Sequence, residues 1–187
     1  MKKRLLIAIL LIAACSPAAV EPTSAPTAES VVSPSEDEAE RPAWHTMPLT
    51  NARTGETFTF ADFEGKTVYV EPMATWCINC MNQQRTVIDV RSQLGDEDYV
   101  FLSLQIETNV TNEQLAEYAD ERDFGWIFAV VTPEMLTELT NTFGRTVTTP
   151  PSTPHFIIYP DGTTSALATG YHSADDLIAK LTAANEA

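Results

Sequence analysis

The sequence of 187 residues has few cysteines, few basic residues and no long apolar run. Its three cysteines are too few for a multi-disulfide scaffold. Eleven Lys and Arg stand against 26 Asp and Glu, for a formal charge of −15. This excludes a nucleic-acid binder and electrostatic binding to anionic lipid, because both need a basic face. The apolar run at residues 5–14 is shorter than the roughly 20 residues that span a bilayer. A composition that is 44% hydrophobic suits one folded domain with a real core.

The first 14 residues have the organisation of a signal peptide. A basic start, Lys2 to Arg4, precedes the apolar residues 5–12 and the small pair Ala13 and Ala14. The alternative is a frayed N-terminal helix of the domain, which the Pro- and Ser-rich stretch behind it would separate from any core. Removal of residues 1–14 would leave a formal charge of −18, because three of the basic residues lie there.

Residues 12–15, Ile-Ala-Ala-Cys, resemble the lipobox of bacterial lipoproteins. The resemblance implies that Cys15 becomes the lipidated N-terminal residue, and two or three acyl chains would anchor the protein firmly. Ser16 stands where Asp would be the usual inner-membrane retention signal. We therefore expect an extracytoplasmic protein, on the periplasmic face of the outer membrane in a diderm bacterium or the outer face of the cell membrane in a monoderm.

Residues 15–43 are predicted to form a disordered tether between the lipidated cysteine and the folded domain. The stretch holds five prolines, many Ser, Thr, Ala and Glu, and no aromatic residue. Such a composition cannot bury enough apolar surface to fold. The predicted organisation is a signal peptide at 1–14, the tether at 15–43 and one folded domain at 44–187.

The folded part alternates predicted strands with predicted helices, which is typical of an α/β layered domain. The strands are expected at 57–60, 66–70, 99–106, 126–131 and 155–159, with 163–169 as the hairpin partner of the last, and the helices at 78–94, 111–121, 133–144 and after Ser173. On the helix 78–94 the apolar side chains Met81, Val87, Ile88 and Leu94 are expected to point inward. Gln83, Gln84 and Arg85 are expected on its solvated face.

A CxxC motif, Cys77-Ile78-Asn79-Cys80, lies at the predicted junction of a strand and a helix. Two thiols one helical turn apart can close a small disulfide. Cys77 would lie at the helix N-terminus, where unpaired backbone N–H groups and the helix dipole stabilise a thiolate. We therefore expect Cys77 to attack and Cys80, one turn further in, to be shielded.

Other interpretations of the pair stay open at this point. A structural disulfide is possible in an exported protein, although so small a ring stabilises little. A structural zinc site needs about four ligands, and the three histidines are far apart in sequence. A copper(I) site suits two thiols with the nearby thioethers of Met73 and Met81. Redox chemistry is the favoured interpretation.

Residues 74–80, Ala-Thr-Trp-Cys-Ile-Asn-Cys, resemble the active-site loop of thioredoxin-like proteins, and more narrowly of membrane-anchored thiol-disulfide oxidoreductases of the TlpA/ResA type. Residues 49–68, with a Gly-Lys step into a strand, and Thr-Pro at 153–154 ahead of a strand and turn match the same family. The resemblance covers about residues 47–181. It implies a thioredoxin-like fold, a three-layer α/β/α domain with a central mixed sheet and an N-terminal β-hairpin.

The resemblance also implies the activity and the partners. The chain would exchange disulfides through the CxxC pair, with no cofactor beyond the redox-active disulfide Cys77–Cys80. Its substrates would be protein thiols and disulfides, its electrons would pass through a membrane or periplasmic partner, and reduction is the favoured direction. The dipeptide between the cysteines, Ile78-Asn79, strongly affects the redox potential of the pair. The resemblance therefore does not by itself imply whether the chain reduces or oxidises its substrates.

The same resemblance assigns roles within the site. Cys77 is the nucleophile, Cys80 the resolving thiol, and Glu71 a buried acid beneath the disulfide with a raised pKa that takes the Cys80 proton. The alternative for Glu71 is a solvent-facing acid at a strand end. Pro72 lacks the N–H of a strand residue, so we expect the sheet to end or bulge there.

Three further residues are implied to bind substrate. Trp76 packs beside the disulfide, and Pro154 is expected to follow a cis bond that exposes the backbone of Thr153 to an extended substrate segment. His155 after it is expected to be a plain strand histidine. Two other functions remain alternatives, a copper(I)-binding lipoprotein and a non-catalytic interaction module with the same fold.

Overall fold

The computed structural model describes residues 41–187. The predicted signal peptide, the lipidated Cys15 and the tether up to residue 40 lie outside the described residues. Within residues 41–187 no helix is long and apolar enough to cross a membrane.

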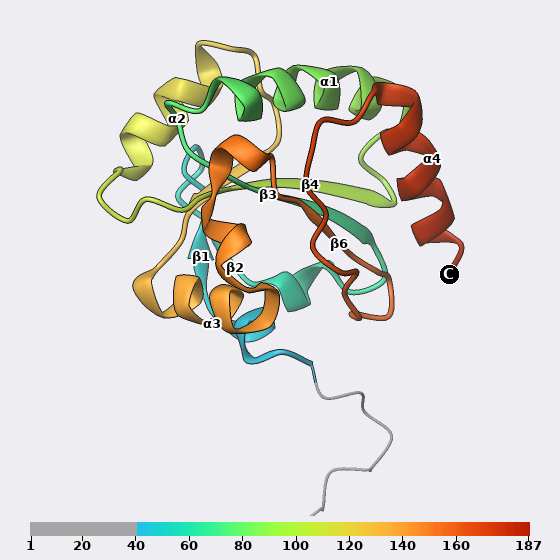
Figure 1. The fold of residues 1–187 in the computed structure, drawn as a ribbon, viewed down its shortest axis with the longest axis horizontal. Helices are drawn as coiled ribbons and strands as arrows, with labels where there is room; N and C mark the ends of the chain where they lie inside the picture. Colours follow the sequence, from blue (N-terminus) through green and yellow to red (C-terminus); the bar gives the residue numbers. More distant parts are fainter. Residues whose placement is uncertain (1–40) are drawn as a thin grey trace, which may run out of the picture. The chain divides into compact units, whose positions relative to one another are not determined.

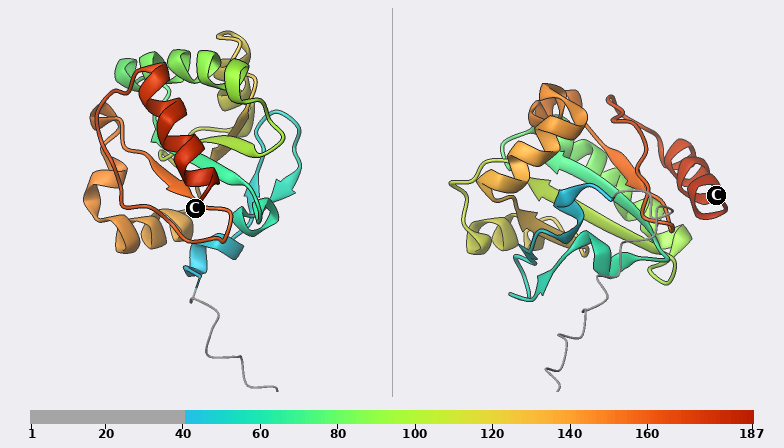
Figure 2. Two further views of the ribbon diagram at one scale, coloured as in Figure 1. Left: turned by 90° about the vertical axis from the view of Figure 1, so that its right-hand side faces the viewer. Right: turned by 90° about the horizontal axis from the view of Figure 1, so that it is seen from below.

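A four-stranded mixed sheet forms the centre of the domain, with the strand order β5-β4-β3-β6 (Figures 1 and 2). Its strands are β3 (Thr67–Met73), β4 (Tyr99–Gln105), β5 (Ile127–Val130) and β6 (Phe156–Ile158). The first three are parallel, and β6 runs antiparallel to β3. A separate antiparallel hairpin, β1 (Leu49–Thr50) with β2 (Thr57–Phe58), confirms the predicted N-terminal hairpin.

Helices cover both faces of the sheet, so the predicted three-layer arrangement is confirmed (Figure 1). Three pack on one face: α1 (Ile78–Leu94), α2 (Asn112–Asp120) and α4 (Ala174–Asn185). The other face carries α3 (Pro133–Phe143) and the N-terminal 3-10 helix Ala43–Thr46. Three more 3-10 helices span Phe60–Phe63, Arg145–Thr148 and Pro150–Ser152.

Alternation along β3 divides the core in two. The odd-numbered Tyr69 and Met73 belong to the cluster beneath α1, whereas Val68 and Val70 belong to the cluster over α3. Successive side chains of a strand point to opposite faces, so Glu71 lies on the α1 face. All seven residues of β3 are buried, as expected for a central strand covered on both faces.

The sheet neither ends nor bulges at Pro72, so that prediction was wrong. Pro72 lies opposite Leu104 in an uninterrupted parallel register. The N–H of Thr67 donates to Asp98 and the carbonyl of Met73 accepts from Ile106, so the odd residues of β3 bond to β4. The nitrogen of Pro72 therefore faces the β6 side, and β6 begins only opposite Val70. The missing N–H removes no ladder hydrogen bond.

Two predicted helix starts are confirmed by their caps. The side chain of Thr132 accepts the Met135 N–H at 3.1 Å, with Pro133 in the first helical turn, and that of Ser173 accepts the Asp176 N–H at 3.2 Å. Residues 163–169 do not form the predicted strand and make only isolated bridges, at Thr164 and Ala168. The Ser165 hydroxyl takes the N–H of Ile157 instead of a backbone carbonyl, which interrupts the ladder.

The inward face of α1 differs from the expectation. Val87 is buried as predicted, but Ile88 is 40% exposed, and Gln83 and Gln84 are completely buried rather than solvated. Buried polar groups require partners. Oε1 of Gln84 accepts from the Tyr118 hydroxyl at 2.8 Å, and both amide atoms of Gln83 bond to the backbone of residue 172, whereas Nε2 of Gln84 has no partner within residues 41–187.

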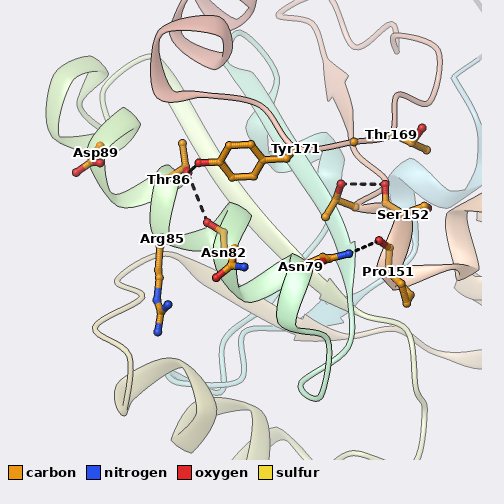
Figure 3. A pocket seen from close by; sticks show the side chains of 11 residues that line it. Asn79, Asn82, Arg85, Thr86, Asp89, Pro151, Ser152, Thr169 and Tyr171 are labelled. Atoms are coloured by element: carbon orange, nitrogen blue, oxygen red, sulfur yellow. Dashed lines mark hydrogen bonds between the residues drawn. The ribbon is translucent and has the colours of Figure 1, made fainter.

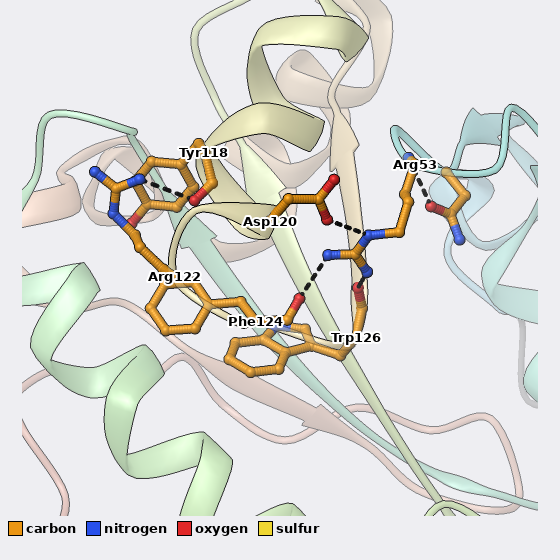
Figure 4. A network of polar contacts seen from close by, with 7 residues as sticks. Arg53, Tyr118, Asp120, Arg122, Phe124 and Trp126 are labelled. Atoms are coloured by element: carbon orange, nitrogen blue, oxygen red, sulfur yellow. Dashed lines mark hydrogen bonds and ion pairs between the residues drawn. The ribbon is translucent and has the colours of Figure 1, made fainter.

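An arginine fixes the N-terminal hairpin to the domain (Figure 4). Arg53 pairs with Asp120 at 2.7 Å and donates to the carbonyl oxygens of Phe124 at 2.9 Å and Trp126 at 3.4 Å. These groups belong to the end of α2 and the loop that leads to β5, so one guanidinium joins segments about 70 residues apart in sequence.

Candidate active site

A disulfide joins Cys77 and Cys80 where β3 ends and α1 begins, with 5.3 Å between the two Cα atoms. Cys77 is the N-cap of α1, and its Sγ accepts the backbone N–H of Cys80 at 3.1 Å. Both side chains are almost fully buried, with 3% of Cys77 and none of Cys80 exposed. The predicted pairing and the position at the helix N-terminus are thereby confirmed.

The surroundings make the two sulfurs chemically unequal. A hydrogen-bond donor and the helix N-terminus lie beside Cys77, and both favour a thiolate. The Sγ of Cys80 lies 3.3 Å from the carbonyl oxygen of Pro150. After reduction this oxygen is an acceptor for a thiol S–H and repels a negative charge, so it favours the protonated form of Cys80. The geometry therefore suits attack by Cys77.

Glu71 is buried on the α1 face, with 1% of its surface exposed. This excludes the solvent-facing alternative. Neither carboxyl oxygen has a hydrogen-bond partner among the described residues. Burial raises the pKa of Glu71 well above its usual value, because a charged carboxylate there loses its hydration. Burial thus favours the neutral acid over the carboxylate at this position. The role of Glu71 in proton transfer stays a prediction.

The predicted cis bond before Pro154 was wrong, because residues 41–187 contain no cis peptide bond. The turn into β6 is made instead by Thr153, whose φ of 48° and ψ of 58° are left-handed. Its N–H donates to Pro150 at 2.8 Å, and its carbonyl oxygen lies 3.0 Å from Nδ1 of His155. Thr153 is largely buried but lines the groove described below, so its contact with a substrate stays a prediction.

Apolar side chains surround the disulfide at the surface. Trp76 is 57% exposed and Ile78 is 68% exposed. More than half of the Trp76 surface is therefore accessible to a binding partner, and its contact with a substrate stays a prediction. Large exposed apolar groups next to a reactive pair are a common mark of a binding surface.

A groove of about 890 Å³ lies alongside the first turns of α1 (Figure 3). One wall carries Asn79, whose Nδ2 donates to the carbonyl oxygen of Pro151 at 2.8 Å. The other carries Tyr171, 61% exposed, whose hydroxyl lies 2.6 Å from that of Thr86. Between them the groove is lined mainly by polar side chains and by Ser152 of the 3-10 helix.

Gln83 holds one wall of this groove, and sequence reasoning missed it. Its Oε1 accepts the N–H of His172 at 2.8 Å, and its Nε2 donates to the carbonyl oxygen of the same residue at 3.4 Å. The two bonds fix the segment that carries Tyr171. A signal for this did exist: Gln83 lies three residues after Cys80 and four before Val87, so all three share one helix face.

His155 lies directly before β6 and pairs with Ala168 in an isolated bridge. It is buried, its ring centroid lies 5.7 Å from that of Tyr69 and 4.7 Å from that of His172, and its Nε2 has no partner among the described residues. Burial lowers its pKa, so the imidazole is neutral near pH 7. In the part of the chain that the structure describes, no three His, Cys, Asp or Glu side chains are grouped to hold a metal ion.

No protein-family model matches the chain, and no curated protein matches it. Solved structures do. A thiol:disulfide interchange protein from Chlorobium tepidum is 18% identical, with a TM-score of 0.60 over 74% of this chain and 92% of its own. A secreted disulfide oxidoreductase of Mycobacterium tuberculosis is 14% identical, with a TM-score of 0.57 over 73% and 95%. The chain has a thioredoxin-like fold.

A third structure with this fold is ScoI of Arabidopsis thaliana with copper bound. It is 16% identical, with a TM-score of 0.56 over 75% of this chain and 96% of its own. At such identities the likeness establishes the thioredoxin-like fold, which confirms the fold predicted from the CxxC loop.

Proposed function

We propose that the chain is a thiol-disulfide oxidoreductase that reduces protein disulfides outside the cytoplasm, anchored to a membrane through Cys15. One observation carries the activity. The Cys77–Cys80 pair lies at a helix N-terminus with a donor beside one sulfur and an acceptor beside the other, and Glu71 is buried on the same face of the sheet. A disulfide with a purely structural role needs none of these neighbours.

The reaction proceeds through a mixed disulfide. The Cys77 thiolate attacks one sulfur of the substrate disulfide, a new S–S bond forms, and the other substrate sulfur leaves as a thiolate that takes a proton from water. Cys80 then loses its proton and attacks Sγ of Cys77, which releases the second substrate thiolate. The substrate gains two electrons, and the pair is oxidised to the disulfide.

Glu71 accepts the proton of Cys80 in the second step, directly or through water. General bases contribute roughly 10²- to 10⁴-fold to such steps. Burial favours the neutral carboxylic acid, so a proton taken up at Glu71 is held strongly enough to relieve the thiol. The carboxyl group must lose that proton again before the next turnover.

The substrates are proteins with an extended segment next to the disulfide. The exposed Trp76, Ile78 and Tyr171 offer apolar contacts, and the groove behind them is long enough for several residues. The formal charge of −15 favours partners with neutral or basic contact faces. The extracytoplasmic location is proposed from the lipobox-like residues 12–15, and the electron-transfer partner from the resemblance to membrane-anchored oxidoreductases. The M. tuberculosis protein that shares the fold is itself secreted.

Trapping of the mixed disulfide tests the activity. The Cys80→Ser variant cannot resolve, so it is expected to accumulate covalent complexes with substrate proteins that dithiothreitol releases. The matched Cys77→Ser variant keeps the Cys80 thiol but is expected to trap nothing through it, because that sulfur is buried beside an acceptor oxygen. Equal trapping by both variants, or by neither, would contradict the proposed roles.

The reduction potential of the cysteine pair shows whether the chain reduces or oxidises its substrates. Equilibration of the full chain against thiol buffers, followed by alkylation, is expected to show a two-electron transition near −270 mV, the value of a reductant. A value near −120 mV would mark an oxidant instead. If the pair resists reduction across this range, the domain is a non-catalytic module.

A second candidate is the carriage of copper(I) as cargo. The fold is shared with a copper-bound ScoI, and Met73 and Met81 lie in the same side-chain cluster as the two cysteines. Thiolates and thioethers suit copper(I). Retention of one copper ion per reduced chain against a competing chelator, lost in Cys77→Ser, would support this candidate.

A further inference from the structure

The layer between the sheet and α1 holds many buried polar atoms that have no partner within residues 41–187. Seven of the eight such side-chain atoms lie there, and only Nε2 of His45 lies on the opposite face. The seven belong to Tyr69, Glu71, Gln84, Gln105, His155 and His172. Buried polar atoms in folded proteins are almost always hydrogen-bonded, and ordered water bonds to those that the protein leaves over. These atoms mark the positions in this otherwise apolar layer where ordered water would bond.

Four of these side chains follow one another from the interior to the surface. Glu71 and Tyr69 lie two residues apart on the same face of β3. The Tyr69 ring lies 5.7 Å from that of His155, and His155 lies 4.7 Å from His172, which is partly exposed. His155 also lines a pocket of about 490 Å³ between β6 and α4. The row begins at a sealed carboxyl group and ends at solvent.

Resting on the proposed function, we propose that Tyr69, His155 and His172 form a proton route between Glu71 and solvent. The proposed reaction needs such a route, because each turnover leaves a proton on a carboxyl group that is only 1% exposed, and the two cysteines are buried as well. Each member of the row has an atom free to accept or donate a proton through water.

The transfer is balanced at each position. Glu71 passes its proton to the Tyr69 oxygen while the Tyr69 hydroxyl proton moves to Nε2 of His155, and the histidines pass one proton on to water. Nδ1 of His155 lies 3.0 Å from the Thr153 carbonyl oxygen and donates to it in the neutral ring. That bond leaves Nε2 as the acceptor, which is the atom without a partner.

Titratable and charged groups from each neighbouring element act on the two histidines. Lys180 of α4 lowers the pKa of both rings, while Asp176 of the same helix raises that of His172. Tyr69 of β3 stacks near His155, and Gln83 of α1 holds the backbone of His172. With burial as the largest influence, both imidazoles are neutral near pH 7 and are able to take up a proton in passing.

The other polar branch of this layer is closed to protons. Tyr118 lies next to a second surface pocket, and its hydroxyl donates to Oε1 of Gln84 at 2.8 Å. An amide carries no ionisable proton near neutral pH, so a chain that ends on Gln84 does not relay one. The histidine branch is the one whose members include imidazoles, which exchange protons near neutral pH.

Removal of one member of the row, with chemical rescue, tests the route. The experiment follows reduction of a peptide disulfide by the reduced full-length chain in stopped flow, through Trp fluorescence, between pH 6 and 8. With dithiothreitol to reduce the chain again after each cycle, His155→Ala is expected to slow the steady-state turnover rate at least fivefold at pH 7, because Glu71 must lose its proton between cycles. Added imidazole restores the turnover rate, whereas pyrazole, of the same size but a far weaker base, does not. Tyr69→Phe, which loses only the hydroxyl, is expected to slow turnover as well.

His45→Ala is the matched control. His45 is also buried, 2% exposed against 3% for His155, and its Nε2 also lacks a partner within the described chain, but it packs on the opposite face of the sheet. Its rate is expected to stay within twofold of the wild type. In a Glu71→Gln background His155→Ala is expected to add no further loss.

Each outcome separates the route from the underlying activity. Absence of exchange in the wild type refutes the proposed function itself. A normal wild type with unchanged rates in folded His155→Ala and Tyr69→Phe overturns the route alone. Equal rescue by imidazole and pyrazole, or an equal loss in His45→Ala, shows a packing effect and overturns it too. If His155→Ala does not fold, the rates of His172→Gln and Tyr69→Phe between pH 6 and 8 decide the question in its place.

Discussion

Replacement of Glu71 by glutamine should change how the stability of the domain depends on pH. The two side chains have nearly the same shape, but glutamine does not titrate. Glu71 is 1% exposed, and burial raises its pKa well above the ordinary value of 4.5. Below pH 4.5 the folded and unfolded chains both carry the protonated carboxyl group, so Glu71 contributes no pH dependence there.

The sign follows from the proton count between the two pKa values. In that window the unfolded chain has lost the proton and the folded chain retains it, so the folded state binds more protons. The free energy of unfolding of the wild type therefore falls with rising pH, by about 1.4 kcal/mol for each pH unit from this one group. Above the raised pKa both states are ionised and the slope disappears.

Urea denaturation of the oxidised full chain measures this slope at pH 4.5, 5.5 and 6.5. The stability of Glu71→Gln relative to the wild type is expected to rise across the series until the pH reaches the raised pKa, by at most about 1.4 kcal/mol per step. The exposed Glu97 provides the control, and Glu97→Gln is expected to stay parallel to the wild type. Parallel curves for Glu71→Gln, or a gap that narrows as the pH rises, would refute the buried, neutral carboxyl group.

Two further substitutions test contacts that position the site. Gln83→Ala removes both bonds to the His172 backbone and leaves those groups without their buried partner. The free energy of unfolding, measured in urea, should fall by roughly 1–3 kcal/mol. Substrate trapping by Cys80→Ser should weaken when the two substitutions are combined. An unchanged stability would show that the segment does not depend on this amide. Arg53→Ala should destabilise the domain by about 1–2 kcal/mol, because the guanidinium holds two backbone carbonyl groups and Asp120, whereas Arg145→Ala at an exposed position should have an effect of less than about 0.5 kcal/mol. Equal thermal shifts in the two variants would contradict this.

Two predictions failed because local rules took no account of neighbours. Pro72 was expected to interrupt β3, yet its nitrogen faces a side of the strand that has no partner at that height. Because Gln83 and Gln84 are polar, they were expected on the solvated face of α1. They are buried on the face that also carries Cys80 and Val87. There Gln84 bonds to Tyr118 and Gln83 to the backbone of His172. In each case the deciding atoms are distant in sequence.

The sequence by itself determined the layered α/β order, two helix starts through their capping residues, and the CxxC pair at a strand–helix junction. These features depend on periodicity, capping and spacing within a few residues, so one-dimensional reasoning reaches them. Only the tertiary structure decided that Glu71 is sealed from water, that Thr153 makes its turn with a left-handed backbone, and that His155 and His172 meet beside Tyr69. Burial and contact between separate elements arise from packing, and the free energy that shifts a buried carboxyl or imidazole exists only once that packing has formed.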